Sequence, residues 1–351
     1  MDLIKQINRY KKIIDGDLEK LKEKYFHLFN QYSPKSVEYL NQFVDFAKRG
    51  KSVRGALVFI TDKLFPNKKI KKEDLKKLAL AFEVIHSSLL IHDDIMDNDT
   101  LRRGQPTIHI FFNQKYKDFI KENNNNFFGI SIALSLGDIG FFIAFDILNR
   151  LNINPKIKNF LSHELIKTGL AQIDDVFFSQ TKIEPKLDDI LNIYKGKTSR
   201  YTFVLPVLTI LKIKNISSKK QKIIEEILQD LGIIFQITDD LIGLFSDETG
   251  KDKGSDIRED KKTILRYLIF KNKNTPPAIK KIFGQDKINE DKIQNVRVFI
   301  NNSEIKTKIK NIIEELTNKI QSKMEKNKKL LPEKFIVLVN NFIDYLITRK
   351  K

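Results

Sequence analysis

Residues 75–91 read LKKLALAFEVIHSSLLI and run directly into HDDIMD at residues 92–97. Apolar residues recur along this stretch at intervals of three and four, which is the periodicity of an amphipathic helix. The same spacing returns in residues 157–178 and 223–244. Alternating strand patterns bounded by Asn-Gly or Asp-Gly turns are absent from the sequence. The pattern therefore predicts an all-α fold in which acidic residues close a buried helix.

The composition is that of a folded globular protein. The chain has 351 residues, 41% of them hydrophobic and 31% charged, which is enough to bury a sizeable core. We predict a single all-α domain over residues 1–351. The sequence contains no cysteine, which excludes disulfides, thiolate zinc sites and a cysteine nucleophile. Residues 1–5 lack the basic and apolar run of a signal peptide, so we expect a cytoplasmic location.

The formal net charge is +18, and nucleic acid, an anionic membrane or an anionic substrate could each account for such a charge. The alternative is compositional, because Lys, Asn and Ile are abundant throughout the chain. The lysines are spread in ones and twos along polar helix faces. A basic tract with interleaved aromatic residues, which is typical of nucleic-acid binding, is missing. We therefore predict no nucleic-acid partner.

One segment has the length and composition of a membrane span. Residues 127–148 are mostly apolar and are about as long as a bilayer is thick. They include Asp138 and Asp146, and charges inside a span are unfavourable. We predict a buried central helix and no transmembrane segment. Loops are expected at residues 113–126, 246–260 and 272–292, the last as a variable surface segment.

The first acidic motif ends the helix predicted at 75–91. Asp93 and Asp97 are four residues apart and lie on one helix face. Their like charges are unfavourable there, more so if partly buried, and a bound cation removes the conflict. Oxygen ligands without His or Cys favour Mg²⁺ over zinc. Such a cluster can also be a solvated face, and Arg102 and Arg103 could be its ion-pair partners or could bind diphosphate oxygens.

A second acidic motif reads FQITDDLIG at residues 235–243. Its pair, Asp239 and Asp240, again closes an apolar helix and is followed by lysines. Two such elements in one chain make a solvated face a poor explanation for both. Two smaller clusters suit an anion: GKSVRG at 50–55 places two cations at a glycine-flanked helix start, and YKGKT at 194–198 is a lysine-rich turn.

These residues together resemble the trans-prenyltransferase family, the polyprenyl diphosphate synthases, and are most similar to its geranylgeranyl-type short-chain members. The resemblance covers residues 50–263 in the family's order. It includes Gly50-Lys51-x-x-Arg54, His86 to Gly104, Lys197-Thr198, and Phe235 to Lys261. It implies a single large helical bundle around a central substrate cavity, of the isoprenoid synthase type. A homodimer and Mg²⁺ as cofactor are also implied.

The resemblance assigns a role to each matching residue. The groups expected to bind the diphosphate of isopentenyl diphosphate are Lys51, Arg54, His86 and Arg103. The expected Mg²⁺ ligands are Asp93, Asp97 and Asp239, with Asp94 and Asp240 in support. The allylic diphosphate would be held by Arg102, Lys197, Lys251 and Lys261. Thr198 and Gln236 would lie near the developing carbocation, and the catalytic set is Asp93, Asp97, Lys197, Gln236 and Asp239.

The implied reaction is a head-to-tail condensation. Mg²⁺ and the cations would neutralise the leaving diphosphate, which makes ionisation of the allylic C–O bond feasible. The double bond of isopentenyl diphosphate would then attack the cation, and a proton would be lost. The chain departs from the family at Gly243, where many members have a third Asp. This departure leaves a weakened or non-catalytic partner subunit as an alternative.

Product length is expected to depend on the helix before the first motif. Ser88 and Leu89 lie about one helical turn before Asp93. In the family, bulky aromatic residues at these positions stop the chain at farnesyl length. We therefore predict geranylgeranyl diphosphate as the product, with longer or farnesyl chains as alternatives, and expect Ser88→Phe to shorten it. A terpene cyclase would share the first motif, but the second motif and Gly50-Lys51 favour elongation.

Overall fold

The computed structural model describes residues 3–66, 70–121, 127–245, 254–285 and 287–349. Within these residues the regular structure is helical, apart from one short hairpin. The prediction of an all-α fold is confirmed. The chain divides into two compact units, residues 2–158 and residues 159–351, which are described in turn. The expectation of one domain over residues 1–351 stays a prediction.

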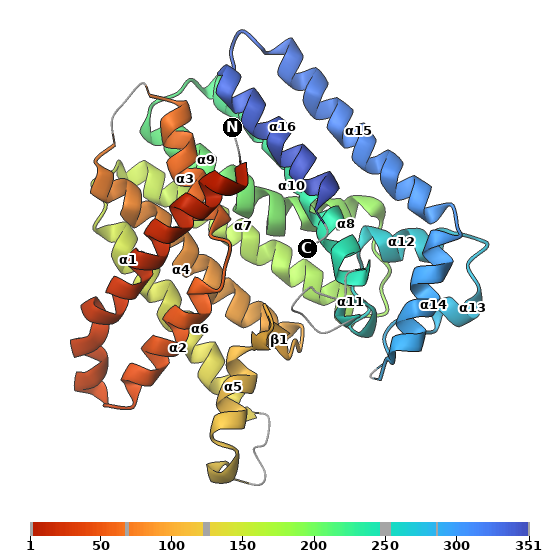
Figure 1. Ribbon diagram of the computed structural model, residues 1–351, viewed down its shortest axis with the longest axis horizontal. Helices are drawn as coiled ribbons and strands as arrows, with labels where there is room; N and C mark the ends of the chain where they lie inside the picture. The colour runs from red at the N-terminus through yellow and green to blue at the C-terminus, as the bar shows by residue number, and fades with distance from the viewer. Residues whose placement is uncertain (1–2, 67–69, 122–126, 246–253, 286, 350–351) are drawn as a thin grey trace. The chain divides into compact units, whose positions relative to one another are not determined.

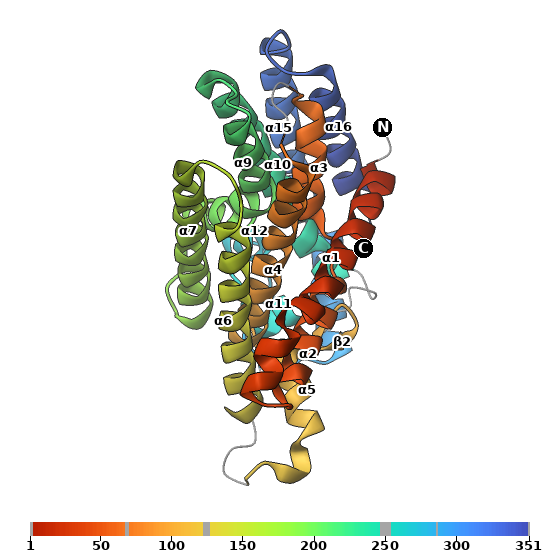
Figure 2. The same ribbon diagram turned by 90° about the vertical axis from the view of Figure 1, so that its left-hand side faces the viewer.

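The N-terminal unit is a group of helices built around α4. Its elements are α1 (Leu3–Tyr32), α2 (Ser36–Lys48), α3 (Val53–Leu64), α4 (Lys72–Met96), β1 (Leu101–Arg102), β2 (Gln105–Pro106), α5 (Ile108–Lys115), the 3₁₀ turn η1 (Lys117–Phe119) and α6 (Phe127–Asn149). α4 packs along α6 on one side and against α3 on another, as Figures 1 and 2 show. This packing gives the helix that carries the first acidic motif a rigid support.

The α4 helix extends the predicted segment 75–91 at both ends. Glu73 and Asp74 lie in its first turn, where negative charge is favourable near the helix N-terminus. Two glycines of α6 allow a close approach to α4. A Cβ on Gly137 would lie 2.3 Å from Nε2 of His92, and one on Gly140 would lie 2.1 Å from Oγ of Ser88. Larger residues at these two positions would therefore force the helices apart.

The chain reverses after α4 through a hairpin that sequence reasoning missed. Leu101 pairs with Pro106 and Arg102 with Gln105. The two turn residues, Arg103 and Gly104, have φ of 56° and 74°, as a type I′ turn requires. Glycine adopts this conformation freely, whereas for Arg103 it is strained. Gly104 was the one sequence signal of this turn. The two strands are too short to show the alternation of apolar and polar residues that predicts a hairpin.

The α6 helix is buried on one face. Ala133, Leu136 and Ile143 are buried, whereas Phe127 and Phe142 are 68% and 70% exposed. The prediction of a buried central helix therefore holds for one side of α6. By length and composition, α6 is the one helix among the described residues that could cross a membrane.

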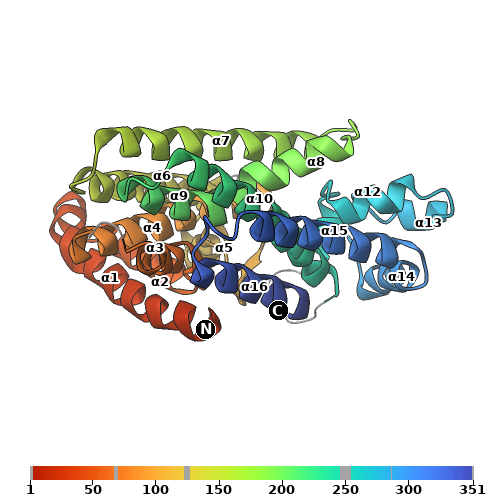
Figure 3. The same ribbon diagram turned by 90° about the horizontal axis from the view of Figure 1, so that it is seen from above.

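The C-terminal unit is built around α10. Its elements are α7 (Pro155–Gln180), most of which lies in this unit, α8 (Leu187–Ile193), the π-helical segment η3 (Tyr194–Val204), α9 (Leu205–Ile213), α10 (Ser218–Phe245), α11 (Ser255–Arg258), α12 (Ile264–Lys271), α13 (Pro277–Lys280), α14 (Glu290–Asn301), α15 (Ile305–Lys326) and α16 (Glu333–Thr348). Figure 3 shows α15 and α16 beside α10. The helices predicted at 157–178 and 223–244 are confirmed by α7 and α10.

The three predicted loops contain more structure than expected. Residues 113–126 include the end of α5 and η1, and residues 246–260 include α11. The segment 272–292 is not purely a surface excursion, because Ile279 and Ile282 are buried in the core. Pro277 occupies the first position of α13, where proline favours a helix start because no N–H partner is needed there. Residues 122–126, 246–253 and 286 lie outside the described residues.

Candidate active site

The N-terminal unit gathers two arginines and a histidine from three elements. Arg54 lies on α3, His86 on α4 and Arg103 in the hairpin turn. Burial, followed by the charges of Arg54, Arg103 and Arg102, lowers the pKa of His86 well below its usual value. Burial, followed by Arg102, lowers the pKa of Arg103 to about 10. Cations this close repel one another, so the cluster is suited to an anion.

Gly50 is required by the position of Arg103. A Cβ on Gly50 would lie 2.9 Å from Nη1 of Arg103, so the guanidinium group covers the glycine. Lys51 follows and is exposed. Ser52 then adopts φ of 52° directly before α3. Strained backbone of this kind is common at binding sites, and here it occurs at both Ser52 and Arg103.

Glu83 is an acidic residue of this cluster that sequence reasoning missed. It is 3% exposed, and its Oε1 accepts a hydrogen bond of 2.7 Å from the N–H of Gly55. Burial raises the pKa of Glu83, while Arg54 and Arg103 oppose the rise. A glutamate within an apolar helix was the available signal. Its carboxylate ties the start of α3 to α4 and partly balances the cations.

The first acidic motif is held together by Arg102. Nε of Arg102 donates to Oδ1 of Asp94 at 2.5 Å, and Nη2 donates to Oδ2 of Asp99 at 3.0 Å. Oδ2 of Asp93 lies 3.7 Å from the same Nη2. Arg102 is 7% exposed. Arg102 was expected either to pair with the acidic cluster or to bind diphosphate. The structure shows that it pairs with the acidic cluster, and a contact with the allylic diphosphate stays a prediction.

The acidic residues of this motif differ in their surroundings. Asp94 is fully buried, and burial raises its pKa to about 7 against the charge of Arg102. Its second oxygen, Oδ2, has no hydrogen-bond partner among the described residues. Asp97 ends α4, and its N–H donates to the carbonyl of Asp93 at 2.8 Å. Enclosure of Asp94 agrees with a supporting role, and its place in the metal site stays a prediction.

The second acidic motif places its two carboxylates in opposite environments. The side chain of Asp239 is 51% exposed, whereas Asp240 is 7% exposed. Oδ1 of Asp240 accepts from Nε2 of Gln236 at 2.8 Å, and Oδ2 accepts from the hydroxyl of Tyr194. Burial, followed by the charge of Asp256, raises the pKa of Asp240 well above its usual value. Asp239 is thus the accessible oxygen donor, whereas Asp240 is enclosed and hydrogen-bonded to Gln236 and Tyr194.

Gln236 is fixed at both ends of its amide. Its Oε1 accepts a hydrogen bond of 2.5 Å from Oγ1 of Thr198, while its Nε2 donates to Asp240. Gly232 lets η3 approach α10, since a Cβ there would lie 2.4 Å from Cα of Ser199. π-helical turns are rare and occur frequently at functional sites. The structure therefore brings Thr198, Gln236 and Asp240 into one hydrogen-bonded group.

Lys197 and Lys261 meet at one carboxylate that sequence reasoning missed. Oδ2 of Asp175, on α7, lies 2.7 Å from Nζ of Lys197 and 3.5 Å from Nζ of Lys261. The three side chains are mostly buried. The available signal was an acidic residue within the helix predicted at 157–178. Lys251, the third lysine expected here, lies outside the described residues.

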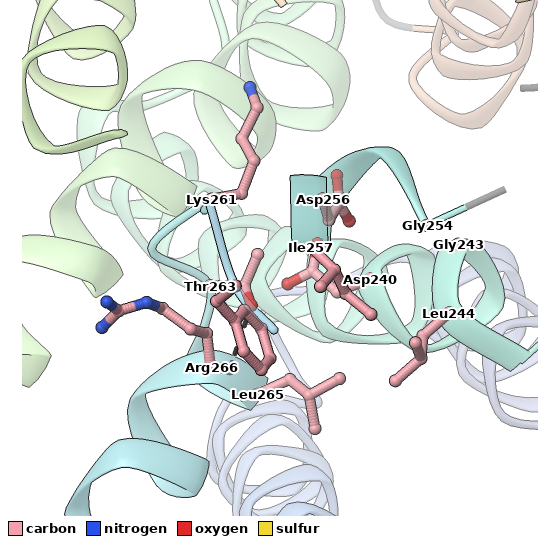
Figure 4. Close-up of a pocket in the computed structure, with 11 residues that line it drawn as sticks. Asp240, Gly243, Leu244, Gly254, Asp256, Ile257, Lys261, Thr263, Leu265 and Arg266 are labelled. Atoms are coloured by element: carbon pink, nitrogen blue, oxygen red, sulfur yellow. Dashed lines mark hydrogen bonds between the residues drawn. The ribbon is translucent and has the colours of Figure 1, made fainter. Parts of the chain in front are cut away.

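The segment that carries Lys261 is anchored by an ion-pair network. Nε of Arg266 donates to Oδ1 of Asp260 at 2.7 Å, and Nη2 donates to Oε1 of Glu184 at 2.9 Å. The guanidinium carbon of Arg266 lies 3.6 Å from the ring centroid of Phe270. Arginine forks paired with two carboxylates hold both partners in a defined geometry. The network fixes the backbone next to Lys261, whose side chain extends away from the pocket (Figure 4).

Gly243, the position where the second motif lacks an acid, lies in the wall of the pocket shown in Figure 4. The pocket is lined by residues that include Asp240, Gly243 and Asp256. A Cβ on Gly243 would lie 3.5 Å from Oδ2 of Asp256. The carboxylate of Asp256, from α11, is thus the acidic group that lies beside Gly243.

Arg349 contacts the second motif from the end of the chain. Its Nη2 donates to the carbonyl of Phe235 at 3.0 Å and to Oγ1 of Thr238 at 2.8 Å. Oδ1 of Asp239 lies 3.5 Å from the same atom. The guanidinium carbon lies 4.5 Å from the ring centroid of Phe235. This contribution of the C-terminal region left no readable motif in the sequence.

The acidic residues of the two motifs fit Mg²⁺ better than a metal that takes all of its ligands from the protein. Among the described residues, no three His, Cys, Asp or Glu side chains gather as a ready-made metal cluster. Mg²⁺ usually keeps several waters and takes one or two carboxylates together with substrate phosphates. Asp93 and Asp97 offer two such carboxylates in the N-terminal unit, and the exposed Asp239 offers one in the C-terminal unit; that they bind Mg²⁺ stays a prediction.

Comparison with known proteins gives a consistent picture. The sequence profile of the polyprenyl synthetase family matches residues 37–300. The chain is 32% identical over 263 residues to the geranylgeranyl diphosphate synthase of Sulfolobus acidocaldarius, covering 73% of this chain and 68% of that protein. It is 29% identical over 255 residues to the short chain isoprenyl diphosphate synthase of Methanocaldococcus jannaschii, covering 70% of each.

The fold is also similar to that of a solved structure. This is the geranylgeranyl pyrophosphate synthase of Corynebacterium glutamicum, complexed with isoprenyl diphosphate and magnesium. The TM-score is 0.88, with 21% sequence identity, and the match covers 98% of this chain and 99% of that one.

Proposed function

Because the chain belongs to the polyprenyl synthetase family and is a trans-prenyltransferase, we propose that it condenses isopentenyl diphosphate with an allylic diphosphate to make geranylgeranyl diphosphate. The observation that carries this proposal is the presence of two cationic groups. Arg54 and Arg103 lie near His86 in the N-terminal unit, and Lys197 and Lys261 meet in the C-terminal unit. A condensing enzyme binds two diphosphates and requires one such group for each, whereas a cyclase binds one.

The side chains divide the work of the reaction. Lys197 and Lys261 donate hydrogen bonds to the allylic diphosphate and stabilise the negative charge that develops as it leaves. Asp93 and Asp97 in the N-terminal unit and Asp239 in the C-terminal unit would hold Mg²⁺, which would supply positive charge to the leaving diphosphate. The oxygens of Thr198 and Gln236, fixed by their mutual hydrogen bond, face the allylic carbon and stabilise its positive charge.

The second substrate is held by the N-terminal cluster. Arg54 and Arg103 bind its diphosphate by charge-assisted hydrogen bonds. His86 has a strongly lowered pKa, so it acts as a neutral hydrogen-bond donor. With the diphosphate fixed, the double bond attacks the allylic cation, and the proton then lost from the adjacent carbon passes to the departing diphosphate.

The proposal of a C20 product is supported by the relatives, two of which are geranylgeranyl diphosphate synthases with 32% and 31% identity. The two residues expected to set chain length, Ser88 and Leu89, differ in burial. Ser88 is fully buried and lies against Gly140, so no open space adjoins its side chain. Leu89 is half-buried and stays the better candidate.

A homodimer in the cytoplasm completes the proposal. The exposed apolar residues of α6, Phe127, Leu134, Phe142 and Phe145, form a face that a second copy of the chain would cover. Multi-angle light scattering should give twice the mass of one chain, and Phe142→Glu should shift the protein toward monomer. A monomeric wild-type protein would contradict this part of the proposal.

The experiment that tests the function is product analysis. Purified protein is mixed with Mg²⁺, isopentenyl diphosphate and dimethylallyl, geranyl or farnesyl diphosphate in turn, and the dephosphorylated products are separated by chromatography. We expect a linear C20 alcohol and no product with excess EDTA. Absence of turnover without a partner protein would instead indicate a non-catalytic subunit, and a cyclic product would indicate a cyclase.

A further inference from the structure

Tyr194 connects three segments of the C-terminal unit through one hydroxyl group. It begins η3 and is 6% exposed. The hydroxyl donates to Oδ2 of Asp240 on α10 and accepts a hydrogen bond of 3.0 Å from the N–H of Ile264, the first residue of α12. Both bonds are buried, and each satisfies a polar group that would otherwise lack a partner in an apolar interior.

Each connected segment carries a group that the proposed reaction uses. Asp240 is the neighbour of Asp239, and Ile264 follows Lys261 by three residues. Tyr194 itself precedes Lys197 by three residues within η3. The hydroxyl therefore fixes the distance between the segments that present a metal ligand and two diphosphate-binding lysines. The ring alone does not achieve this, because apolar packing is not directional.

The hydroxyl of Tyr194 satisfies one of the two carboxylate oxygens of Asp240. Oδ1 is held by Gln236 at 2.8 Å, and the described hydrogen bond to Oδ2 is the one from Tyr194. Loss of that donor would leave a buried carboxylate oxygen and a buried N–H unsatisfied, so both segments would move to find partners. Gly243 offers no side chain that could replace the donor.

We propose that Tyr194 is a positioning residue that sets Asp239, Lys197 and Lys261 for the Mg²⁺-bound diphosphate of the allylic substrate. It acts through Asp240 and Ile264 and does not touch the substrate. This inference rests on the proposed function for the identity of the ligand. Partners that orient metal ligands typically change metal affinity or activity by about ten- to a hundredfold when removed.

The test is Tyr194→Phe, with Tyr267→Phe as the matched control. Tyr267 lies on α12, and its ring lies under Nζ of Lys271, but its hydroxyl makes no hydrogen bond with the described residues. Binding of Mn²⁺ in the presence of inorganic pyrophosphate is followed by electron paramagnetic resonance. We expect about ten- to a hundredfold weaker binding in Tyr194→Phe and wild-type binding in Tyr267→Phe. Wild-type binding in Tyr194→Phe overturns the inference.

Two further measurements separate positioning from loss of the fold. Circular dichroism gives the folded fraction, and binding is compared at a temperature where every variant is folded. In a double-mutant cycle of Tyr194→Phe with Asp240→Asn, the losses of Mn²⁺-binding free energy should be clearly non-additive, because Tyr194 acts through Asp240. Additive losses overturn the inference. If the wild type binds Mn²⁺ and pyrophosphate but does not condense substrates, the proposed function fails while the role of Tyr194 stands.

In the active protein the steady-state constants give an independent readout. Tyr194→Phe should raise KM for the allylic diphosphate by about tenfold or more and leave KM for isopentenyl diphosphate unchanged. Equal increases for both substrates would point to a general loss of structure and would contradict a role confined to the second motif.

Discussion

The guanidinium group of Arg103 covers Gly50, and a Cβ added to that glycine would lie 2.9 Å from Nη1 and 3.2 Å from Nη2. The two residues are 53 positions apart by their numbers, and the contact brings the GKSVRG segment beside the hairpin turn. Arg103 has a strained backbone, so its position is enforced by the fold. The glycine is therefore part of the expected isopentenyl diphosphate site.

Gly50→Ala should weaken binding of isopentenyl diphosphate. The added methyl group displaces the end of a flexible side chain, so stability should change little. KM for isopentenyl diphosphate should rise by about tenfold, the equivalent of about 1.4 kcal/mol, as measured by steady-state kinetics. Gly16→Ala is the control, because a Cβ there meets nothing within 4 Å. An unchanged KM in Gly50→Ala would show that Arg103 does not bind this substrate.

Asp175→Asn should weaken binding of the allylic substrate. The carboxylate holds Lys197 and Lys261 at one oxygen, and without it two flexible, mutually repelling side chains lose their common position. Bound Mg²⁺ would reduce the repulsion between Asp175 and the diphosphate. We expect KM for the allylic diphosphate to rise on the order of tenfold, with KM for isopentenyl diphosphate unchanged.

The control for this variant is the neighbouring residue. Asp174 is exposed on α7, so Asp174→Asn removes the same charge without touching the lysines. Asp175→Glu should recover part of the affinity because it restores the charge. Equal KM values in the two asparagine variants would show that the effect is one of net charge.

His86→Gln should make the protein less sensitive to acid. In the folded state the pKa of His86 is lowered by burial and by the neighbouring arginines, while in the unfolded chain it is near 6.5. Below pH 6.5 the unfolded state therefore binds a proton that the folded state does not, and stability is lost as the pH falls. The variant should lose about 2 kcal/mol less than the wild type between pH 7 and pH 5.

Urea unfolding at several pH values measures this difference. His163→Gln is the comparison, because His163 is exposed on α7, and it should follow the wild type. If His86→Gln keeps the full acid sensitivity, His86 does not remain neutral in the folded protein.

Substitution of Leu89, and not of Ser88, should shorten the product. Ser88 is packed against Gly140, and its Oγ donates to the carbonyl of Val84 at 3.2 Å. Ser88→Phe should therefore overpack the contact between α4 and α6 and destabilise the protein by about 1–3 kcal/mol. Leu89→Phe should shift the main product toward C15 without lowering the melting temperature. An unchanged product profile would remove Leu89 from the pocket wall.

Local sequence predicted the helices and most residues of the motifs. Asp93 and Asp97 share a face because helix periodicity depends on residues a few positions apart. The hairpin after α4 escaped prediction because its strands are two residues long. Asp175 escaped because its partners are 22 and 86 residues away, and spacing carries no information about such contacts.

The sequence by itself determined that this chain is helical and that it carries two acidic pairs with cations beside them. Which member of a pair meets solvent was decided by the tertiary structure. Asp239 and Asp240 are chemically identical neighbours, yet one is exposed and the other is buried under the hydroxyl of Tyr194. The physical reason is that the side chains of successive helix residues point about 100° apart. The elements packed on one face of α10 therefore determine which of the two carboxylates is buried.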